Sequence, residues 1–304
     1  MNKILETSTS HVEELPSGVY QVRSLPDAAY SELWDSVIID EGLKEALICQ
    51  ATLNISIRKR VSRAVIPMHG IILLVGKPGT GKTSLAKGLA SETAKLLPKD
   101  EPVTFIEIEP HAMTSAVHGE SQRAVTELFG QTIADYAEAG PTIVLLDEVE
   151  SILVDRAKLS LETNPVDVHR ATDAALVELD RLAEKFPNLL IITTSNFPQA
   201  IDVAFVSRCD LVMHIPMPNY NACRNILEET LIGFSRTFPS VKELIDTDEF
   251  DTVVRACVGL DGRQIRKVVA SACAFSRETA ADPNRLSITD LLCAAGRSKD
   301  DAKK

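Results

Sequence analysis

A glycine-rich loop at residues 76–83 constrains this 304-residue chain more than any other feature. The loop reads GKPGTGKT and matches the pattern G-x-x-x-x-G-K-[ST]. An apolar run at 70–75 precedes it, and a helical pattern at 82–97 follows it. Glycines let backbone N–H groups turn toward a phosphate chain, and a helix that begins at Gly81 directs its positive end at the same anion. The sequence therefore predicts a phosphate-binding loop between a buried strand and a helix.

Individual positions of the loop have expected roles. Lys82 would reach the β- and γ-phosphates of a nucleotide, and the Thr83 hydroxyl would ligate Mg²⁺. The other expected phosphate-binding positions are Gly76, Pro78, Gly79, Thr80, Gly81 and Ser84. A chance match to this pattern arises in roughly one chain in a hundred, so an idle glycine turn explains it poorly.

Two acids, Asp147 and Glu148, come directly after a second apolar run at 142–146. A strand ending there places both carboxylates at the carboxyl edge of a sheet, where open α/β folds bind ligands. We expect Asp147 to hold the hydration shell of Mg²⁺, and Glu148 to orient and deprotonate an attacking water. A strand that merely ends in a solvated turn has the same pattern, but its pairing with the glycine-rich loop favours hydrolysis.

Asn196 closes a third apolar run, at 189–194. Its amide could hydrogen-bond the γ-phosphate or the nucleophilic water, or it could cap a helix at Pro198. We favour the first interpretation because the other two elements are present.

Two arginines are further candidates, Arg208 and Arg263. An arginine that stabilises γ-phosphate charge can contribute about 10³–10⁵ in rate. Surface salt bridges, Arg208 with Asp210 and Arg263 with Asp261, are equally compatible with the spacing alone.

Short apolar runs alternate with helical stretches between residues 67 and 218. The apolar runs are at 70–75, 103–108, 142–146, 189–194 and 211–215, and the helical stretches at 82–97, 120–138, 167–185 and 198–207. Strands that are apolar throughout are buried on both faces, so we expect an α/β fold with a five-stranded parallel sheet sandwiched by helices. Helical patterns at about 220–235, 249–257, 263–279 and 287–296 predict a small all-α domain after it.

These patterns divide the chain into four parts. We expect a short polar arm at 1–27, an α/β domain at 28–218, a helical domain at 219–296 and a charged tail at 297–304. A helical pattern near the start of the α/β domain ends in a basic cluster of Arg58, Lys59, Arg60 and Arg63. We favour basic residues on the last helical turn over a nucleic-acid patch, because no aromatic residues interleave them.

Composition excludes several classes of function. The chain has 43 acidic and 32 basic residues, a net charge of −11, which argues against a sequence-independent DNA binder. The first 18 residues lack the apolar core of a signal peptide, and no run reaches the length of a membrane span. The six cysteines form no CxxC pair and indicate reduced thiols. We therefore expect a cytoplasmic protein without membrane or direct nucleic-acid partners.

Together these motifs resemble the AAA+ ATPases, in which Walker A, Walker B, sensor 1, arginine finger and sensor 2 follow in this order. Several stretches resemble the pachytene checkpoint protein 2 type in particular: 33–36, 79–85, 146–151, 193–196 and 201–206. The resemblance implies a P-loop AAA+ module with a small C-terminal helical lid. It also implies that Arg208 is the finger that reaches the ATP of a neighbouring subunit, and that Arg263 is the sensor 2 arginine in cis.

The same branch implies a homo-hexameric ring that uses ATP and Mg²⁺ to open or disassemble complexes of HORMA-domain proteins. Only about 27 residues precede the ATPase module, which resembles the compact bacterial relatives associated with nucleotide-second-messenger antiphage systems. The expected pore loop comprises Ala116, Val117, His118 and Gly119. It lacks the aromatic grip residue of the family, because Val117 and His118 occupy that place.

Two other functions are compatible with parts of this pattern. A nucleotide-switched DNA-processing AAA+ protein, such as an initiator or clamp loader, is disfavoured by the net charge of −11 and by the lack of a DNA-binding domain. A P-loop phosphotransferase is disfavoured by Glu148 and by the helical C-terminal domain.

Overall fold

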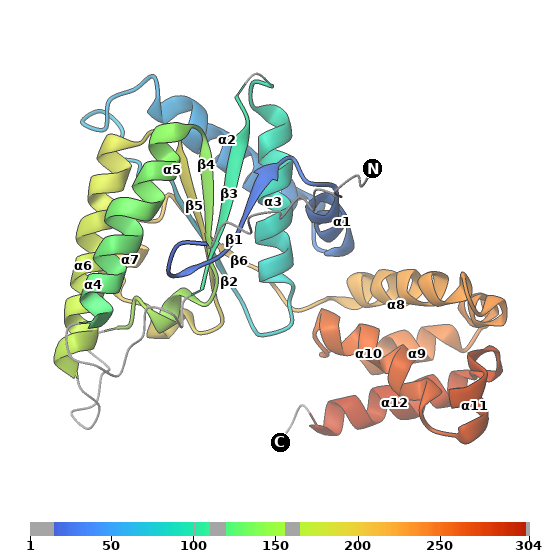
Figure 1. Ribbon diagram of the computed structural model, residues 1–304. Coiled ribbons are helices and arrows are strands. Elements are labelled where there is room, and N and C mark those ends of the chain that lie inside the picture. Colours follow the sequence, from blue (N-terminus) through green and yellow to red (C-terminus); the bar gives the residue numbers. More distant parts are fainter. Residues whose placement is uncertain (1–14, 100, 110–119, 156–164, 302–304) are drawn as a thin grey trace, which may run out of the picture.

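The computed structural model describes residues 15–99, 101–109, 120–155 and 165–301. A central sheet with helices on both faces forms the α/β body, and a cluster of helices lies beside one of these faces (Figure 1). No helix in the described ranges is both long and apolar enough to cross a membrane.

The sheet has six strands in the order β1-β3-β4-β5-β2-β6. They are β1 (Val19–Leu25), β2 (Ile71–Val75), β3 (Val103–Ile108), β4 (Thr142–Leu146), β5 (Leu189–Ser195) and β6 (Leu211–His214). Strands β2 to β6 are parallel, which confirms the predicted five-stranded parallel sheet. All residues of β2, β4 and β5 are buried, as expected for strands that helices cover on both faces.

Strand β1 corrects the prediction that residues 1–27 form only a polar arm. It pairs antiparallel with β3 at the edge of the sheet, with Leu25 opposite Val103. Val19 and Leu25 are buried, while the residues between them are not. Gln21 donates a short hydrogen bond to Glu107 of β3, which also pairs with Lys87 at 2.8 Å. The strand was missed because a polar edge strand has only a weak apolar pattern.

Helices cover the two faces of the sheet. One face carries α4 (Glu120–Glu127), the π-helical segment Leu128–Ile133, α5 (Ala134–Ala139), α6 (Pro165–Lys185) and α7 (Val203–Val206). The other carries α1 (Ala28–Ser36), α2 (Glu41–Arg58) and α3 (Lys82–Leu96). Alternate residues of each strand point to opposite faces of the sheet. Ile71 and Leu73 pack in the core on the α4–α7 face, and Ile72 and Leu74 in the core on the α1–α3 face.

Of the basic cluster, only Arg58 lies in the last turn of α2 as expected; Lys59, Arg60 and Arg63 follow the helix. The Arg58 guanidinium is turned inward and donates to the carbonyls of Ala183, Phe186 and Leu189 at 2.6–3.2 Å. It thereby satisfies carbonyl groups where α6 ends. Burial lowers the pKa of Arg58 to about 10.

The helical lid has a core of its own (Figure 1). It consists of α8 (Tyr220–Ser235), the 3₁₀ segment Pro239–Asp246, α9 (Phe250–Cys257), α10 (Gly262–Cys273), α11 (Arg277–Ala281), the 3₁₀ turn Pro283–Arg285 and α12 (Ile288–Asp301). We propose the domain boundary between residues 218 and 219, because the Asn219 side chain caps α8, the first helix of the lid.

Two predicted helices are interrupted. The segment 198–207 contains a 3₁₀ turn and the short helix α7, because Ile201 between them forms a bridge with Val154. The segment 263–279 breaks after α10, where Ser276 caps α11 through a capping box. The first interruption comes from a contact distant in sequence and the second from a local cap, and apolar periodicity reports neither.

Gly88 of α3 provides a test of how closely α1 packs on this face. A Cβ at Gly88 would lie 2.6 Å from Cβ and 2.8 Å from Cα of Trp34 in α1. We expect Gly88→Ala to lower the free energy of unfolding by about 1–3 kcal/mol, the usual cost of overpacking. Urea unfolding would measure this.

Gly233 of α8 is a matched control, because a Cβ there meets nothing within 4 Å. Gly233→Ala is expected to stabilise the protein by about 0.5–1 kcal/mol through helix propensity alone. If Gly88→Ala stabilised the protein as much as Gly233→Ala does, the conclusion that α1 packs closely on α3 would be wrong.

Candidate active site

The predicted phosphate-binding loop connects β2 to α3 and needs its glycines. Gly79 and Gly81 have φ values of +79° and +90°, in the left-handed region that favours glycine. A Cβ at Gly76 would lie 2.5 Å from the carbonyl oxygen of Ile215. Pro78 is exposed in the loop, and the Thr80 hydroxyl donates to the Lys77 carbonyl at 2.9 Å. The loop is thus held in one conformation from within and by β6.

Lys82 lies at the centre of the site. Its Nζ donates to the carbonyl oxygens of Gly76 and Lys77, each at 2.9 Å, and to Oδ1 of Asn196 at 2.7 Å. The residue is only 6% exposed. Burial lowers the pKa of Lys82, whereas the nearby carboxylates of Asp147, Glu150 and Glu148 raise it. A buried ammonium among oxygen acceptors is suited to holding a polyanion.

Thr83 and Asp147 meet as predicted. The Thr83 hydroxyl lies 2.9 Å and 3.0 Å from the two carboxylate oxygens of Asp147. The Thr194 hydroxyl of β5 makes a short hydrogen bond to Asp147 Oδ1. A hydroxyl and a carboxylate are the protein ligands that Mg²⁺ takes beside nucleotide phosphates, so this donor set fits the predicted ion.

Glu148 has an unusual backbone. Its φ and ψ are 52° and 53°, and within the described ranges it is the only non-glycine residue with positive φ. This conformation is unfavourable for most residues and clusters at functional sites. The Glu148 N–H donates to the Thr194 hydroxyl at 3.1 Å, and its Oε1 accepts from Nδ2 of Asn196 at 3.0 Å.

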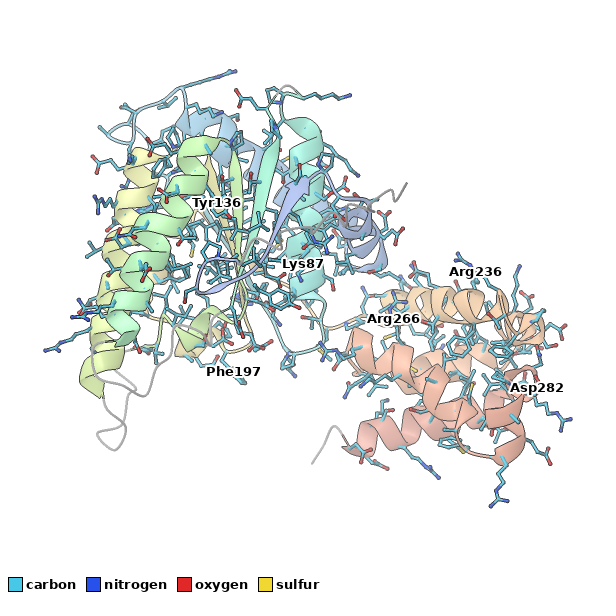
Figure 2. All side chains as sticks on the ribbon, in the orientation of Figure 1. Lys87, Tyr136, Phe197, Arg236, Arg266 and Asp282 are labelled. Carbon is cyan, nitrogen blue, oxygen red and sulfur yellow. The ribbon has the colours of Figure 1, made fainter. Side chains whose placement is uncertain are left out.

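Asn196 therefore links Lys82 and Glu148, two predicted site residues that are far apart in the sequence. Its amide accepts from Lys82 and donates to Glu148, and its backbone N–H donates to Glu150 Oε1 at 2.9 Å. The other Glu150 oxygen is buried without a hydrogen-bond partner among the described residues. The alternative cap at Pro198 is wrong, because Phe197 is the N-cap residue there and caps with no side-chain hydrogen bond. Exposed Phe197 marks this edge of the body (Figure 2).

The lid reaches the loop through the start of α10. The backbone N–H of Arg263 donates to the Gly79 carbonyl at 3.4 Å. The Asp261 carboxylate caps α10 by accepting from the Gln264 N–H at 2.8 Å, and it lies where a Cβ on Gly79 would point. Asp261 thus acts as a helix cap rather than as the salt-bridge partner considered for Arg263.

A cavity of about 220 Å³ lies between the body and the lid. Its lining comes from five segments: Ser36 to Ile39, Gly79 to Gly81 with Ser84, Pro216 with Pro218, Ile226 of α8, and Gly262, Arg263 and Arg266 of α10. Arg266, at the end of the lid that faces the body (Figure 2), donates to the Ser36 carbonyl at 2.8 Å and pairs with Glu229 at 3.2 Å. The cavity is therefore bordered by the glycine-rich loop on one side and by the lid on another.

Arg208 forms an ion pair within its own chain. It follows α7 and pairs with Asp180 of α6, with Nη2–Oδ2 at 2.7 Å and Nε–Oδ1 at 3.0 Å. The expected partner in the alternative interpretation, Asp210, instead accepts from the backbone N–H groups of His69, Gly70 and Ile71. The salt bridge to Asp210 was therefore wrong.

The expected pore-loop residues Ala116 to Gly119 lie outside the described residues. Three residues of the described part were missed by the sequence reasoning: Thr194, Glu150 and Asp180. Thr194 had a usable signal, since a polar residue closing a buried strand beside two acids is conspicuous. Asp180 had none, because it lies 28 residues from Arg208 within an ordinary amphipathic helix.

Comparison with known proteins agrees with this geometry. The model of the ATPase family associated with various cellular activities (AAA) matches residues 72–217. CD-NTase-associated protein 6 of Pseudomonas aeruginosa is 54% identical over 285 residues, which cover 94% of this chain and 93% of that protein. Pachytene checkpoint protein 2 homologs of Danio rerio and Homo sapiens are each 34% identical over 80% of this chain, and the match spans 62% and 61% of their length.

Two solved structures share the fold. PCH-2 of C. elegans has a TM-score of 0.73 and 26% identity, over 93% of this chain and 76% of that one. A chain of the E. coli MS115-1 HORMA:CdnC:Trip13 complex has a TM-score of 0.70 over 92% of this chain and 95% of that one, and at 18% identity it shows the fold alone. The chain belongs to the AAA ATPase family, within the group that contains CD-NTase-associated protein 6 and the pachytene checkpoint protein 2 homologs.

Proposed function

We propose that this ATPase is a ring-shaped, homo-hexameric remodeler that opens or disassembles complexes of HORMA-domain proteins. We further propose that it regulates a bacterial nucleotide-second-messenger antiphage system in the cytoplasm. The observation that carries the proposal is the 54% identity to CD-NTase-associated protein 6 over nearly the full length of both chains. The pachytene checkpoint protein 2 homologs support it, although this chain spans only about three fifths of their length.

In the proposed mechanism the glycine-rich loop holds the phosphates of ATP. Backbone N–H groups from Gly79 to Thr83 and the Lys82 ammonium neutralise the phosphate oxygens, and the cavity beside the loop holds the nucleoside. Thr83 and Asp147 would hold Mg²⁺, which supplies further charge neutralisation at the phosphates when bound. The lid borders the cavity through Arg263 and Arg266, so the nucleotide would lie between the lid and the glycine-rich loop.

Glu148 acts as the general base in this mechanism. Its carboxylate is exposed, and its position is fixed by the Asn196 amide and by its own N–H on Thr194. Asn196 also contacts Lys82, so one side chain sets the distance between the phosphate-binding cation and the base. Arg208 completes the site of the next subunit in the ring, which makes hydrolysis depend on assembly.

Glu148→Gln should separate binding from hydrolysis. The glutamine keeps the volume and can still accept from Asn196, but it cannot take a proton from water. We expect ATP affinity to be retained and turnover to fall by about 10²–10⁴-fold. Phosphate release and binding of a fluorescent ATP analogue would measure the two quantities, and unchanged turnover would remove Glu148 as the base.

The same variant tests the substrate class. Because it binds ATP without hydrolysing it, Glu148→Gln should hold a closed, peptide-bound HORMA-domain protein in a stable complex. We expect co-elution in gel filtration with ATP and none with ADP. Failure to bind such a protein in either state, with ATP binding intact, would contradict the proposed substrate.

Thr194→Val should impair turnover without loss of the fold. Its hydroxyl contacts both Asp147 and the strained backbone of Glu148, and hydrogen bonds to charged groups contribute about 1.5–3 kcal/mol each. We expect kcat to fall at least about tenfold, since 1.4 kcal/mol corresponds to that factor. Thr193→Val is the control: it loses a hydroxyl bond to the Ile72 carbonyl and should keep its turnover. Equal losses in both variants would show a general effect of strand β5.

Val117→Glu tests the proposed pore loop. A charge at the grip position should weaken hold on the substrate chain, so release of peptide from a HORMA-domain protein should slow while ATPase activity stays largely intact. Val65→Glu, at a residue that is 71% exposed outside the loop, is the control for added charge. Normal peptide release by Val117→Glu would argue against a role for this loop.

A further inference from the structure

Charged side chains from three segments meet around Asp180 and Arg208, next to the amino ends of β2 and β6. Asp180 comes from α6, and Arg208 from the segment between α7 and β6. Arg63 and His69 come from the segment between α2 and β2. Arg58 and Asp210 lie at the edge of this group, each electrostatically coupled to the other. We call these six residues the Asp180 cluster.

Asp180 holds the Arg208 guanidinium in a fixed plane. Two parallel contacts, at 3.0 Å and 2.7 Å, join Nε and Nη2 to the two carboxylate oxygens. Nη1 donates to the Ala204 carbonyl at 2.7 Å. A fork of this kind fixes direction as well as distance. The hydrogen bond from Arg208 also lowers the pKa of Asp180, so the pair stays ionised at neutral pH.

Asp180 is itself held from the opposite side. Arg63 donates to its backbone carbonyl at 3.1 Å and approaches Oδ1 at 3.5 Å. His69 Nε2 lies 3.1 Å from the same oxygen and 2.5 Å from Arg63 Nη2. Burial and Arg63 lower the pKa of His69, which favours the neutral imidazole. Arg63 and His69 thus hold the Asp180 carboxylate independently of Arg208.

The cluster keeps a positive charge despite this pairing. It contains three arginines and two aspartates, so one positive charge is in excess when His69 is neutral. The Arg208 side chain is 23% exposed, so its guanidinium reaches the surface of the body. A partly exposed arginine whose direction is already fixed is suited to meeting a phosphate brought by another subunit, because less side-chain entropy remains to be lost.

We propose that Asp180 is the positioning residue for Arg208, which it holds in the direction needed to complete the ATP site of a neighbouring subunit. This inference rests on the proposed function, because it requires Arg208 to act across a subunit interface. Arg63 is the second support, since it fixes Asp180 from behind.

A double-mutant cycle tests this role. We expect Asp180→Asn in the assembled, full-length protein to lower kcat by about 10- to 100-fold, as misplacing a catalytic group does. The KM for ATP and the affinity for nucleotide should stay unchanged, because Asp180 does not contact the cavity of its own chain. In an Arg208→Ala background, Asp180→Asn should cause no further loss, since its effect passes through Arg208.

Two further variants keep the test decisive. Glu184→Gln removes the same charge from an exposed position one turn further along α6 and should leave kcat and thermal stability unchanged. Asp180→Glu retains the charge if Asp180→Asn proves unstable; its longer side chain displaces the guanidinium, so kcat should again fall, and again only when Arg208 is present.

The outcomes separate the possible errors. Equal losses from Asp180→Asn with and without Arg208 would show that Asp180 acts independently and would overturn the proposal. A turnover at or above that of the unmodified protein would overturn it too, because the salt bridge would then restrain Arg208. If Arg208→Ala alone left turnover unchanged, the arginine finger of the proposed function would fail, and the role of Asp180 with it.

Discussion

Burial of both faces of the central sheet is the constraint on which the rest of the molecule depends. Strands covered by helices on both sides have room for polar side chains only where they end. The register then decides which ends meet: Leu146 pairs with Thr193, and Val75 with Ser195. Asp147 therefore comes beside Thr194, and the glycine-rich loop beside Asn196. The site is a consequence of where three apolar runs, those of β2, β4 and β5, end.

At this edge of the sheet, two side chains each contact groups with different predicted chemical roles. Asn196 contacts both the cation that would hold phosphate and the acid that would activate water. Thr194 contacts both the acid beside Thr83 and the backbone of Glu148. Lys82 and Thr194 are buried, so each loses solvation that only its hydrogen-bond partners replace. These shared contacts link the phosphate-binding part of the site to the part that would activate water, which favours a site with one fixed geometry.

Sequence reasoning predicted the parts of this molecule whose signals are local. The five parallel strands and the loop at residues 76–83 follow from runs of adjacent residues, and their positions were confirmed. Strand β1 was missed because Gln21 and Arg23 give it a polar alternation, and its stability comes from pairing with β3, whose partner residues are 78 to 89 positions away in the sequence. The partner of Arg208 was also missed, since the nearest acid in sequence, Asp210, has its carboxylate engaged by three backbone N–H groups. Contacts that depend on tertiary packing produce no recognisable pattern in the neighbouring sequence.

The lid adds a thermodynamic link between the cavity and the orientation of the two domains. Its contacts with the body fall on the site itself: the Arg263 N–H on the Gly79 carbonyl, the Asp261 carboxylate against Gly79, and Arg266 on the carbonyl that ends α1. A ligand that binds between these groups must favour one arrangement of lid and body over others. By linkage, it shifts the lid by the same free energy with which the lid position changes its affinity. The position of the lid and the binding of a ligand at the glycine-rich loop are therefore thermodynamically coupled.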